Sequence, residues 1–177
     1  MTGLHFHRFH TAFGEFSVVW DQAEKIRRIY LPSKTYSLSR DFPTAEPEAN
    51  PNIKSVFEDI ISFLDGHDVR FDLGRVALEE CSCFQRKVLL AEYGIPRGYV
   101  STYRRIAEHV GCPGGSRAVG GALASNPFPI FIPCHRAVRS DGGLGGYQRG
   151  LEMKRLLLEM EGVGFLGGSV DMSRIYY

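Results

Sequence analysis

The sequence predicts a two-domain α/β (α+β) fold, with an antiparallel sheet and a helix in residues 1–76 and a mostly helical domain in residues 77–177. Three observations support this prediction. Residues 4–31 contain three short apolar runs separated by turn residues, which is typical of strands. Residues 51–64 carry apolar side chains at helical spacing. From residue 82 onward, capping residues and glycine-rich turns indicate four further helices.

The first three elements are expected to be strands joined by tight turns, in an antiparallel meander. They are Leu4–His10, Glu15–Trp20 and Lys25–Leu31. His5 and His7 would share one face of the first strand, but no third metal ligand is evident. A polar strand face is therefore favoured over a metal site.

The segment Ser33–Asn52 is rich in Ser, Pro, Asp and Glu and lacks a sustained period, which predicts a connecting loop. The apolar pattern that begins at Pro51 predicts a helix ending at Asp65-Gly66. A short strand over Val69–Leu73 is expected to return to the sheet. Arg75–Cys81 then links the two domains.

Four helices are predicted in the second domain. They are Cys83–Tyr93, Tyr103–Val110, Ser116–Ala124 and Leu151–Met160. Ser82, with Gln85 three residues on, is a plausible N-cap for the first helix, and the second and third indicate a helix-turn-helix. Gly120 and Gly121 lie inside the third helix, where each costs about 1 kcal/mol relative to alanine. Either close packing of another helix or close approach to a DNA groove would compensate that cost.

Composition places the chain among ordinary globular proteins, with 44% hydrophobic and 23% charged residues. No apolar run approaches the roughly 20 residues of a membrane span, and the N-terminal residues lack the apolar centre of a signal peptide. We expect a cytoplasmic protein, nuclear in a eukaryote, with no membrane partner. The four cysteines form no C-x-x-C pair, so neither a disulfide framework nor a zinc finger is indicated.

The charge is unevenly distributed along the chain. Residues 97–155 hold nine basic residues against three acidic ones, a balance of +6, so the rest of the chain sums to −5 at a net charge of +1. A positive segment on an otherwise acidic protein is expected of a phosphate-binding face. A solvated charged surface would explain the same counts.

A short apolar run interrupted by prolines ends at Cys134, which is followed directly by His135 and Arg136. Pro133 has a fixed φ, so the chain leaves the run in a defined direction. Neighbouring cationic groups lower the pKa of a thiol, and the thiolate is the nucleophile. We therefore predict that Cys134 is reactive, the alternative being a small buried residue in a turn.

Five motifs follow one another in the second half of the chain. They are G-x-V-S-T-Y-x-x-I-A at Gly98–Ala107, R-A-V-G-G-A at Arg117–Ala122, N-P at Asn126-Pro127, I-P-C-H-R at Ile132–Arg136 and G-x-L-x-G-Y at Gly142–Tyr147. In order and spacing they resemble the O6-alkylguanine-DNA alkyltransferase family, also called the methylated-DNA–protein-cysteine methyltransferases. The resemblance covers roughly Phe84 to Val163, and the first half carries no comparable signature.

The resemblance implies a ribonuclease-H-like N-terminal domain and a C-terminal winged helix-turn-helix domain. It also implies DNA repair by direct reversal, in which the alkyl (methyl) group of O6-alkylguanine in double-stranded DNA is transferred irreversibly to Cys134. The protein would act once, as a monomer without cofactor or metal, after binding the minor groove and flipping the base.

The roles of individual residues follow from the same resemblance. Cys134 would accept the alkyl group, His135 would take the thiol proton through a water, and Glu161 would orient His135. Asn126 would link the helix Ser116–Ala124 to the loop that carries Cys134. Tyr103 would push the 3′ phosphate of the target nucleotide and help to rotate it. The DNA-binding residues would be Arg117, which fills the vacated space, with Tyr103, Ala118, Gly120, Gly121 and Ala122. The substrate pocket would be formed by Tyr147, Val138, Arg139, Ser140 and Pro133, and Arg136 would brace the loop.

Two departures from the family pattern are visible. Gln148 stands where some members carry a small hydroxyl residue, which puts the tolerance of bulky O6 substituents in question. Residues 1–76 contain no cysteine, so the structural zinc site of some members is not supported.

Three other functions are weighed against this one. A lesion binder without alkyl transfer would have tryptophan at the cysteine position. A thiol hydrolase using Cys134 and His135 would turn over repeatedly. A helix-turn-helix regulator would be indifferent to Cys134→Ser.

Overall fold

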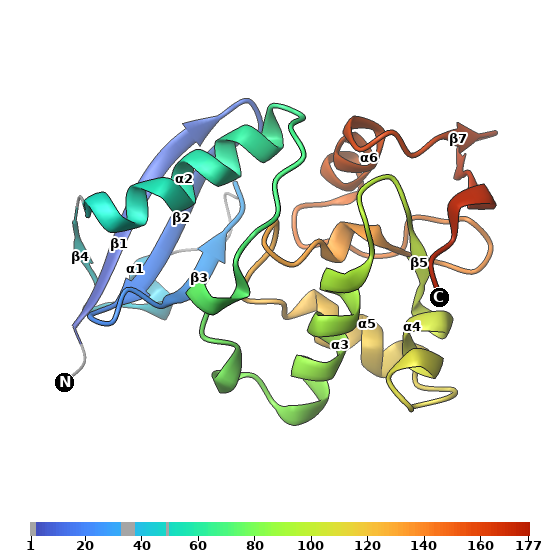
Figure 1. The fold of residues 1–177 in the computed structure, drawn as a ribbon, viewed down its shortest axis with the longest axis horizontal. Helices are drawn as coiled ribbons and strands as arrows, with labels where there is room; N and C mark the ends of the chain where they lie inside the picture. Colours follow the sequence, from blue (N-terminus) through green and yellow to red (C-terminus); the bar gives the residue numbers. More distant parts are fainter. Residues whose placement is uncertain (1–2, 33–37, 49) are drawn as a thin grey trace. The chain divides into compact units, whose positions relative to one another are not determined.

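The structure, a computed structural model, describes residues 3–32, 38–48 and 50–177. The chain forms two compact units, each described here by itself (Figure 1). The first unit comprises Met1–Glu80 with Pro127–Phe131, and the second comprises Cys81–Asn126 with Ile132–Tyr177. Within the described ranges, no helix is long and apolar enough to cross a membrane.

The first unit is built on a four-stranded sheet in the order β3-β2-β1-β4. Strands β1 (Leu4–Thr11), β2 (Gly14–Asp21) and β3 (Ile26–Tyr30) pair antiparallel, which confirms the predicted meander. The two-residue strand β4 (Glu46–Pro47) lies parallel to β1 at the edge.

Helix α2 (Pro51–Leu64) lies across one face of this sheet (Figure 1). It begins at Pro51, as the sequence predicts, and Asn50 caps it by accepting a hydrogen bond from the backbone N–H of Asn52. Phe57 of α2 stacks on His7 and Phe9 of β1, with ring centroids 4.8 and 5.2 Å apart. His7 thus belongs to an aromatic contact beneath α2, and the predicted polar strand face is wrong at this position.

A second apolar cluster joins Leu38 of the short helix α1 (Leu38–Asp41) to Val19 and Tyr30 of the sheet. Because alternate residues of a strand point to opposite faces, Val19 cannot share a face with Val18 and Trp20, and all three are buried. Strand β2 is therefore covered on both faces, which explains its continuous apolar sequence.

Two predictions for this unit are wrong. The expected loop Ser33–Asn52 contains α1 and β4 in its described part, while residues 33–37 and 49 lie outside the described residues. The expected strand Val69–Leu73 does not pair with the sheet. Phe71 instead packs against Phe63 and Phe131, and two 3-10 turns follow, η1 (Leu73–Arg75) and η2 (Leu78–Glu80). The chain meets the sheet later, where Val76 forms a bridge with Ile26.

Residues Pro127–Phe131, from the second half of the chain, are part of the first unit. The backbone N–H of Ile29 donates to the carbonyl oxygen of Pro127 at 2.9 Å, and Phe131 stacks on Phe71 at 4.4 Å between centroids. Ile130 is buried and has a φ of 75°, a left-handed conformation that β-branched residues rarely adopt. The packing of its neighbours on both sides holds this conformation.

The second unit contains helices α3 (Cys83–Gly94), α4 (Tyr103–His109), α5 (Ser116–Ala124) and α6 (Leu151–Met160), as predicted within one residue. The predicted cap Ser82 accepts a hydrogen bond from the backbone N–H of Gln85 at 3.2 Å. Thr102 caps α4, its side chain accepting a hydrogen bond from the backbone N–H of Arg105 at 3.2 Å. Helices α3, α4 and α5 contact one another.

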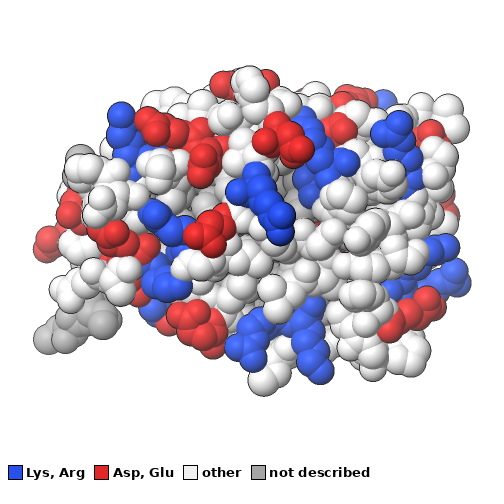
Figure 2. All heavy atoms as spheres, in the orientation of Figure 1, with Lys and Arg blue, Asp and Glu red and all other residues white. Residues whose placement is uncertain are grey.

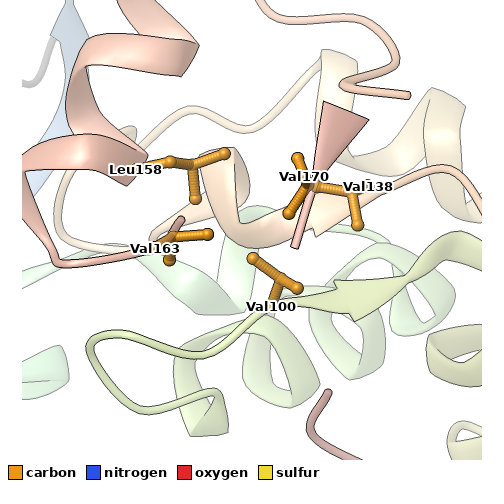
Figure 3. Packing of buried hydrophobic residues seen from close by; sticks show 5 residues of the cluster. All are labelled: Val100, Val138, Leu158, Val163 and Val170. Atoms are coloured by element: carbon orange, nitrogen blue, oxygen red, sulfur yellow. The ribbon is translucent and has the colours of Figure 1, made fainter. Parts of the chain in front are cut away.

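Short strands and 3-10 turns connect these helices. They are β5 (Ser101–Thr102) and β6 (Ala137–Val138), which are parallel, β7 (Phe165–Leu166) and β8 (Ser169–Val170), which are antiparallel, and the turns η3 (Cys134–Arg136) and η4 (Met172–Arg174). Figure 3 shows a core cluster that draws on several of these segments. Its members are Val100, Val138, Leu158, Val163 and Val170. This cluster ties β6, which directly follows η3, to α6 and to the residues after it.

Candidate active site

Cys134 begins η3, and its side chain is almost completely buried, with 5% of the residue exposed. The carbonyl oxygen of Ile132 accepts two hydrogen bonds, from the backbone N–H of Cys134 at 2.8 Å and from Nδ2 of Asn126 at 3.1 Å. Asn126 is itself buried and follows α5 by two residues. The amide thus fixes the turn that presents the cysteine.

The thiol of Cys134 is not an activated thiolate in this structure. Burial raises its pKa to about 11, which outweighs the lowering by the Asn126 amide and by the charge of Lys154. The expectation that cationic neighbours activate Cys134 is therefore wrong for the resting protein. The reason is geometric, because the guanidinium of Arg136 bonds to Glu161 and to a backbone carbonyl.

His135, Arg136 and Glu161 form a buried hydrogen-bonded group beside Cys134. Nε2 of His135 lies 2.9 Å from Oε1 of Glu161, and neither side chain is exposed. Arg136 donates to both carboxyl oxygens of Glu161, from Nε at 2.8 Å and from Nη2 at 2.7 Å. A third bond runs from its Nη1 to the carbonyl oxygen of Ile95 at 2.5 Å. The guanidinium therefore holds Glu161 and the end of α3 together.

The protonation of this group follows from its surroundings. Burial opposes ionisation of Glu161, but the hydrogen bonds and charges of His135 and Arg136 prevail and lower its pKa to about 2. Burial lowers the pKa of His135 below its ordinary value, although Glu161 opposes this. An ionised carboxylate can only accept, so Nε2 of a neutral His135 carries the proton and Nδ1 carries the lone pair. His135 is thus a base held in one tautomer by its partner.

Lys154 is a site residue that the sequence analysis missed. It is completely buried on α6, and Nζ donates to the carbonyl oxygens of Ala137 at 2.6 Å, Leu144 at 2.6 Å and Gly146 at 3.2 Å. Three acceptors match the three N–H donors of an ammonium group. Lys154 therefore joins the segment after Cys134 to the glycine-rich loop. In the sequence, the position of Lys154 beside Met153, on the apolar face of a helix, could have indicated that it is buried.

The glycine-rich loop carries Tyr147 toward this group. The rings of Tyr147 and His135 lie edge to face, with centroids 6.5 Å apart. Within the described part of the chain, the buried Tyr147 hydroxyl has no hydrogen-bond partner, and burial raises its pKa well above the ordinary value. Gln148 next to it donates from Nε2 to the carbonyl oxygen of Asn126 at 2.9 Å. A buried donor without a protein acceptor is available to a ligand.

Comparison with known proteins decides the family. A methylated-DNA–protein-cysteine methyltransferase of Methanothermobacter thermautotrophicus is 43% identical over 154 residues, which cover 86% of this chain and 82% of that protein. The chain belongs to this family. The resemblance and the enzyme class predicted from the sequence are thereby confirmed.

Other comparisons agree with this assignment. Residues 83–163 match the family described as 6-O-methylguanine DNA methyltransferase, DNA binding domain. The structure is similar to that of a Mycobacterium tuberculosis OGT in complex with DNA, with a TM-score of 0.72, 28% identity and coverage of 89% of this chain and 92% of that one. It is also similar to the O6-methylguanine-DNA methyltransferase of Pyrococcus kodakaraensis, with a TM-score of 0.67, 28% identity and coverage of 90% and 99%.

The other predicted pocket residues of the methyltransferase differ in their surroundings. The side chain of Val138 belongs to the core cluster of Figure 3, so only its backbone is available to a substrate. Pro133 is buried at the start of η3. Arg139 and Ser140 are exposed, and Arg139 pairs with Asp141 at 2.7 Å.

The predicted DNA-binding residues lie on α4 and α5. Arg117, Ala118 and Gly121 are exposed, and Gly120 and Ala122 are partly exposed. A Cβ added at Gly120 or Gly121 would meet no atom within 4 Å. Close helix packing therefore does not explain these glycines, and the alternative of a small-residue core helix is wrong.

Tyr103, the first residue of α4, is partly buried. Its hydroxyl lies 3.5 Å from the carbonyl oxygen of Gly146 and 3.4 Å from Nζ of Lys154. Burial raises its pKa to about 12, so it is a neutral phenol. Figure 2 shows acidic and basic side chains mixed on the face that it draws.

Proposed function

We propose that this methyltransferase repairs O6-alkylguanine in double-stranded DNA by one irreversible transfer to Cys134. The thiolate attacks the alkyl carbon, an S–C bond forms, and the bond from carbon to O6 breaks. The electron pair leaves with O6, and the guanine anion takes up a proton. The observation that carries the proposal is the buried chain of hydrogen bonds from His135 to Glu161 and Arg136, next to Cys134.

His135 takes the thiol proton in this mechanism, through a water, and Glu161 stabilises the imidazolium that forms. The high pKa of the buried thiol suits this order of events, because the nucleophile is generated only when the base acts. The product is a thioether, which water does not hydrolyse readily. The protein is then consumed in one turnover.

DNA binding is proposed to use α4 and α5 as the helix-turn-helix of a winged domain that enters the minor groove. The open space around Gly120 and Gly121 supports this, since a groove wall needs smooth helix surface. Arg117 fills the position that the flipped guanine leaves, and Tyr103 pushes its 3′ phosphate. The similarity to an M. tuberculosis OGT in complex with DNA supports DNA binding.

The pocket proposal rests on Tyr147, whose buried hydroxyl has no acceptor in the described part of the protein. It contacts the flipped guanine and stabilises the leaving anion, while backbone groups of residues 138–140 line the pocket. We also propose that residues 1–76 form a ribonuclease-H-like domain, that residues 77–177 form the winged domain, and that the protein acts as a monomer in the cytoplasm or nucleus.

The experiment that tests alkyl transfer is intact-mass spectrometry after mixing the protein with excess duplex DNA that carries one O6-methylguanine. We expect a mass gain of one methylene, located on Cys134 by peptide mapping and stopping at one equivalent. Cys134→Ser is the control and gains nothing. Binding without mass gain would indicate a lesion binder, and repeated turnover of small esters or amides would indicate a hydrolase.

Gly121→Ala is expected to raise the stability of the protein and to lower its affinity for DNA. Alanine is favoured over glycine inside a helix by about 1 kcal/mol, and the added methyl group meets open space, so we expect a rise of that order in the free energy of unfolding. The same methyl group would obstruct the groove wall, so affinity for duplex DNA should fall. Denaturant titration and fluorescence anisotropy measure the two effects. Unchanged affinity would contradict the assignment of α5 to the DNA.

A further inference from the structure

Glu92 is a completely buried acid that the proposed repair chemistry does not use. It lies on α3, the helix that contacts the turn η3 with Cys134. At helical spacing it shares the buried face of α3 with Val88, Leu89 and Ile95. Placing an ionised carboxylate on such an apolar face is costly unless it is paired.

The surroundings of Glu92 contain charges but no close partner. Within the described residues, neither of its carboxyl oxygens has a hydrogen-bond partner, and the backbone N–H of Ala137 faces the carboxyl. The titratable and charged groups around it come from every neighbouring element: Lys154 of α6, Cys134 and Arg136 of η3, Tyr103 of α4, Glu161 and Tyr177. Burial raises the pKa of Glu92 to about 8, although Lys154 and Arg136 oppose this. Glu92 is thus a neutral acid at neutral pH.

Lys154 is the cation that this acid faces at neutral pH, although burial lowers its pKa to about 8 against the opposing charges of Cys134 and Glu92. Its Nζ is fixed by the three carbonyl oxygens described above, one of which belongs to Ala137, three residues after Cys134. The charge of Lys154 lowers the pKa of the Cys134 thiol, whereas an ionised Glu92 raises it. The two groups therefore act on the same nucleophile with opposite sign.

We propose that Glu92 is a positioning residue that sets the charge around the nucleophile. As a neutral acid it leaves the ammonium of Lys154 uncompensated, so the Cys134 thiolate forms more readily. As a carboxylate it places a negative charge near the nucleophile and suppresses the thiolate. The inference rests on the proposed alkyl transfer, because it assigns a control to that same nucleophile.

The first test is the pH profile of single-turnover methyl transfer by wild type and Glu92→Gln, with the O6-methylguanine duplex. Each unit by which the carboxylate raises the thiol pKa lowers the thiolate fraction tenfold. We expect equal rates at about pH 6.5 and a rate about tenfold higher for Glu92→Gln at about pH 9. Glu159→Gln, an exposed change on α6, is the matched control and should follow wild type at both pH values. A constant ratio of Glu92→Gln to wild type across pH would overturn the proposal.

Glu92→Leu is a control for altered packing in Glu92→Gln, because leucine fits the apolar face of α3 and also removes the charge. Both variants should show the same pH profile, and a high-pH gain seen with only one of them would overturn the charge argument. A direct readout is the infrared carbonyl band of a protonated carboxylic acid at neutral pH. We expect it in wild type and not in Glu92→Gln, and its absence from wild type would also overturn the proposal.

A DNA-free measurement separates this inference from the proposed function. The rate at which iodoacetamide labels Cys134, followed by peptide mass mapping against the other three cysteines, reports the thiolate alone. We expect the same pH-dependent difference between wild type and Glu92→Gln. If wild type never accepts a methyl group but this difference is present, the repair function fails while the role of Glu92 stands.

Discussion

Replacing Glu161 with glutamine is expected to lower the free energy of unfolding by about 3–5 kcal/mol, because it leaves the buried charge of Arg136 without its counter-ion. The pKa of Glu161, lowered from 4.5 to about 2 by its contacts with His135 and Arg136, corresponds to about 3 kcal/mol. Urea titration of both proteins at neutral pH measures the difference.

Glu159→Gln is the matched control for this variant. Glu159 is two residues earlier, and its pair with Arg155 has a separation of 2.9 Å, but both side chains are over 40% exposed. An exposed pair contributes only about 0–1 kcal/mol. If both changes lowered the free energy of unfolding equally, the buried pair would stabilise the protein no more than the exposed pair does.

The pH dependence provides a second check on Glu161. Its folded-state pKa is depressed, so its stabilisation is present above the unfolded value of 4.5 and is lost as the pH falls toward about 2. Glutamine cannot titrate. The stability difference between wild type and Glu161→Gln should therefore shrink in acid, and a difference that stays constant down to about pH 2 would contradict the ion-pair explanation.

His135→Gln is expected to slow methyl transfer by about 10²–10⁴-fold, the contribution of a positioned general base. Glutamine can still donate from its amide to Glu161, so the hydrogen bond to the carboxylate is preserved while the proton acceptor is lost. Rapid-quench sampling of the methylated protein by mass spectrometry measures the single-turnover rate.

The controls for His135→Gln are DNA affinity and melting temperature, both of which should stay near wild type if the change removes only the base. Because burial lowers the pKa of His135, the wild-type base stays neutral to lower pH than an ordinary histidine. A rate within about threefold of wild type would assign the proton transfer to another group.

Local signals were sufficient to predict most elements. The N-cap Ser82, the start of α2 at Pro51 and the bounds of α6 depend on neighbours in sequence, which a pattern can show. The failures depend on distant partners. Phe71 was assigned to a strand because nothing in its own segment reveals Phe63 and Phe131, which pack against it.

The residues of the candidate site were likewise predicted only in part. The motif around Cys134 pointed to the nucleophile and its neighbours. The expected lowering of the thiol pKa is not found, because Arg136 bonds to Glu161 and burial of the thiol raises its pKa. Lys154 was counted among the basic residues of the positive segment 97–155, and Glu92 was not singled out at all. Each is a charged residue at a position where the helical pattern expects an apolar one, and such a position indicates a buried polar group.

The placement of Pro127–Phe131 in the first unit has a consequence for the order of synthesis. A ribosome has made all of β1, β2, β3 and α2 long before it reaches Phe131, the residue that stacks on Phe71. The first unit therefore cannot complete its core as a nascent chain until half of the second unit, Cys81–Asn126, has also been made. A chain released at residue 80 should resemble a partly packed intermediate, and the two units are expected to finish folding together.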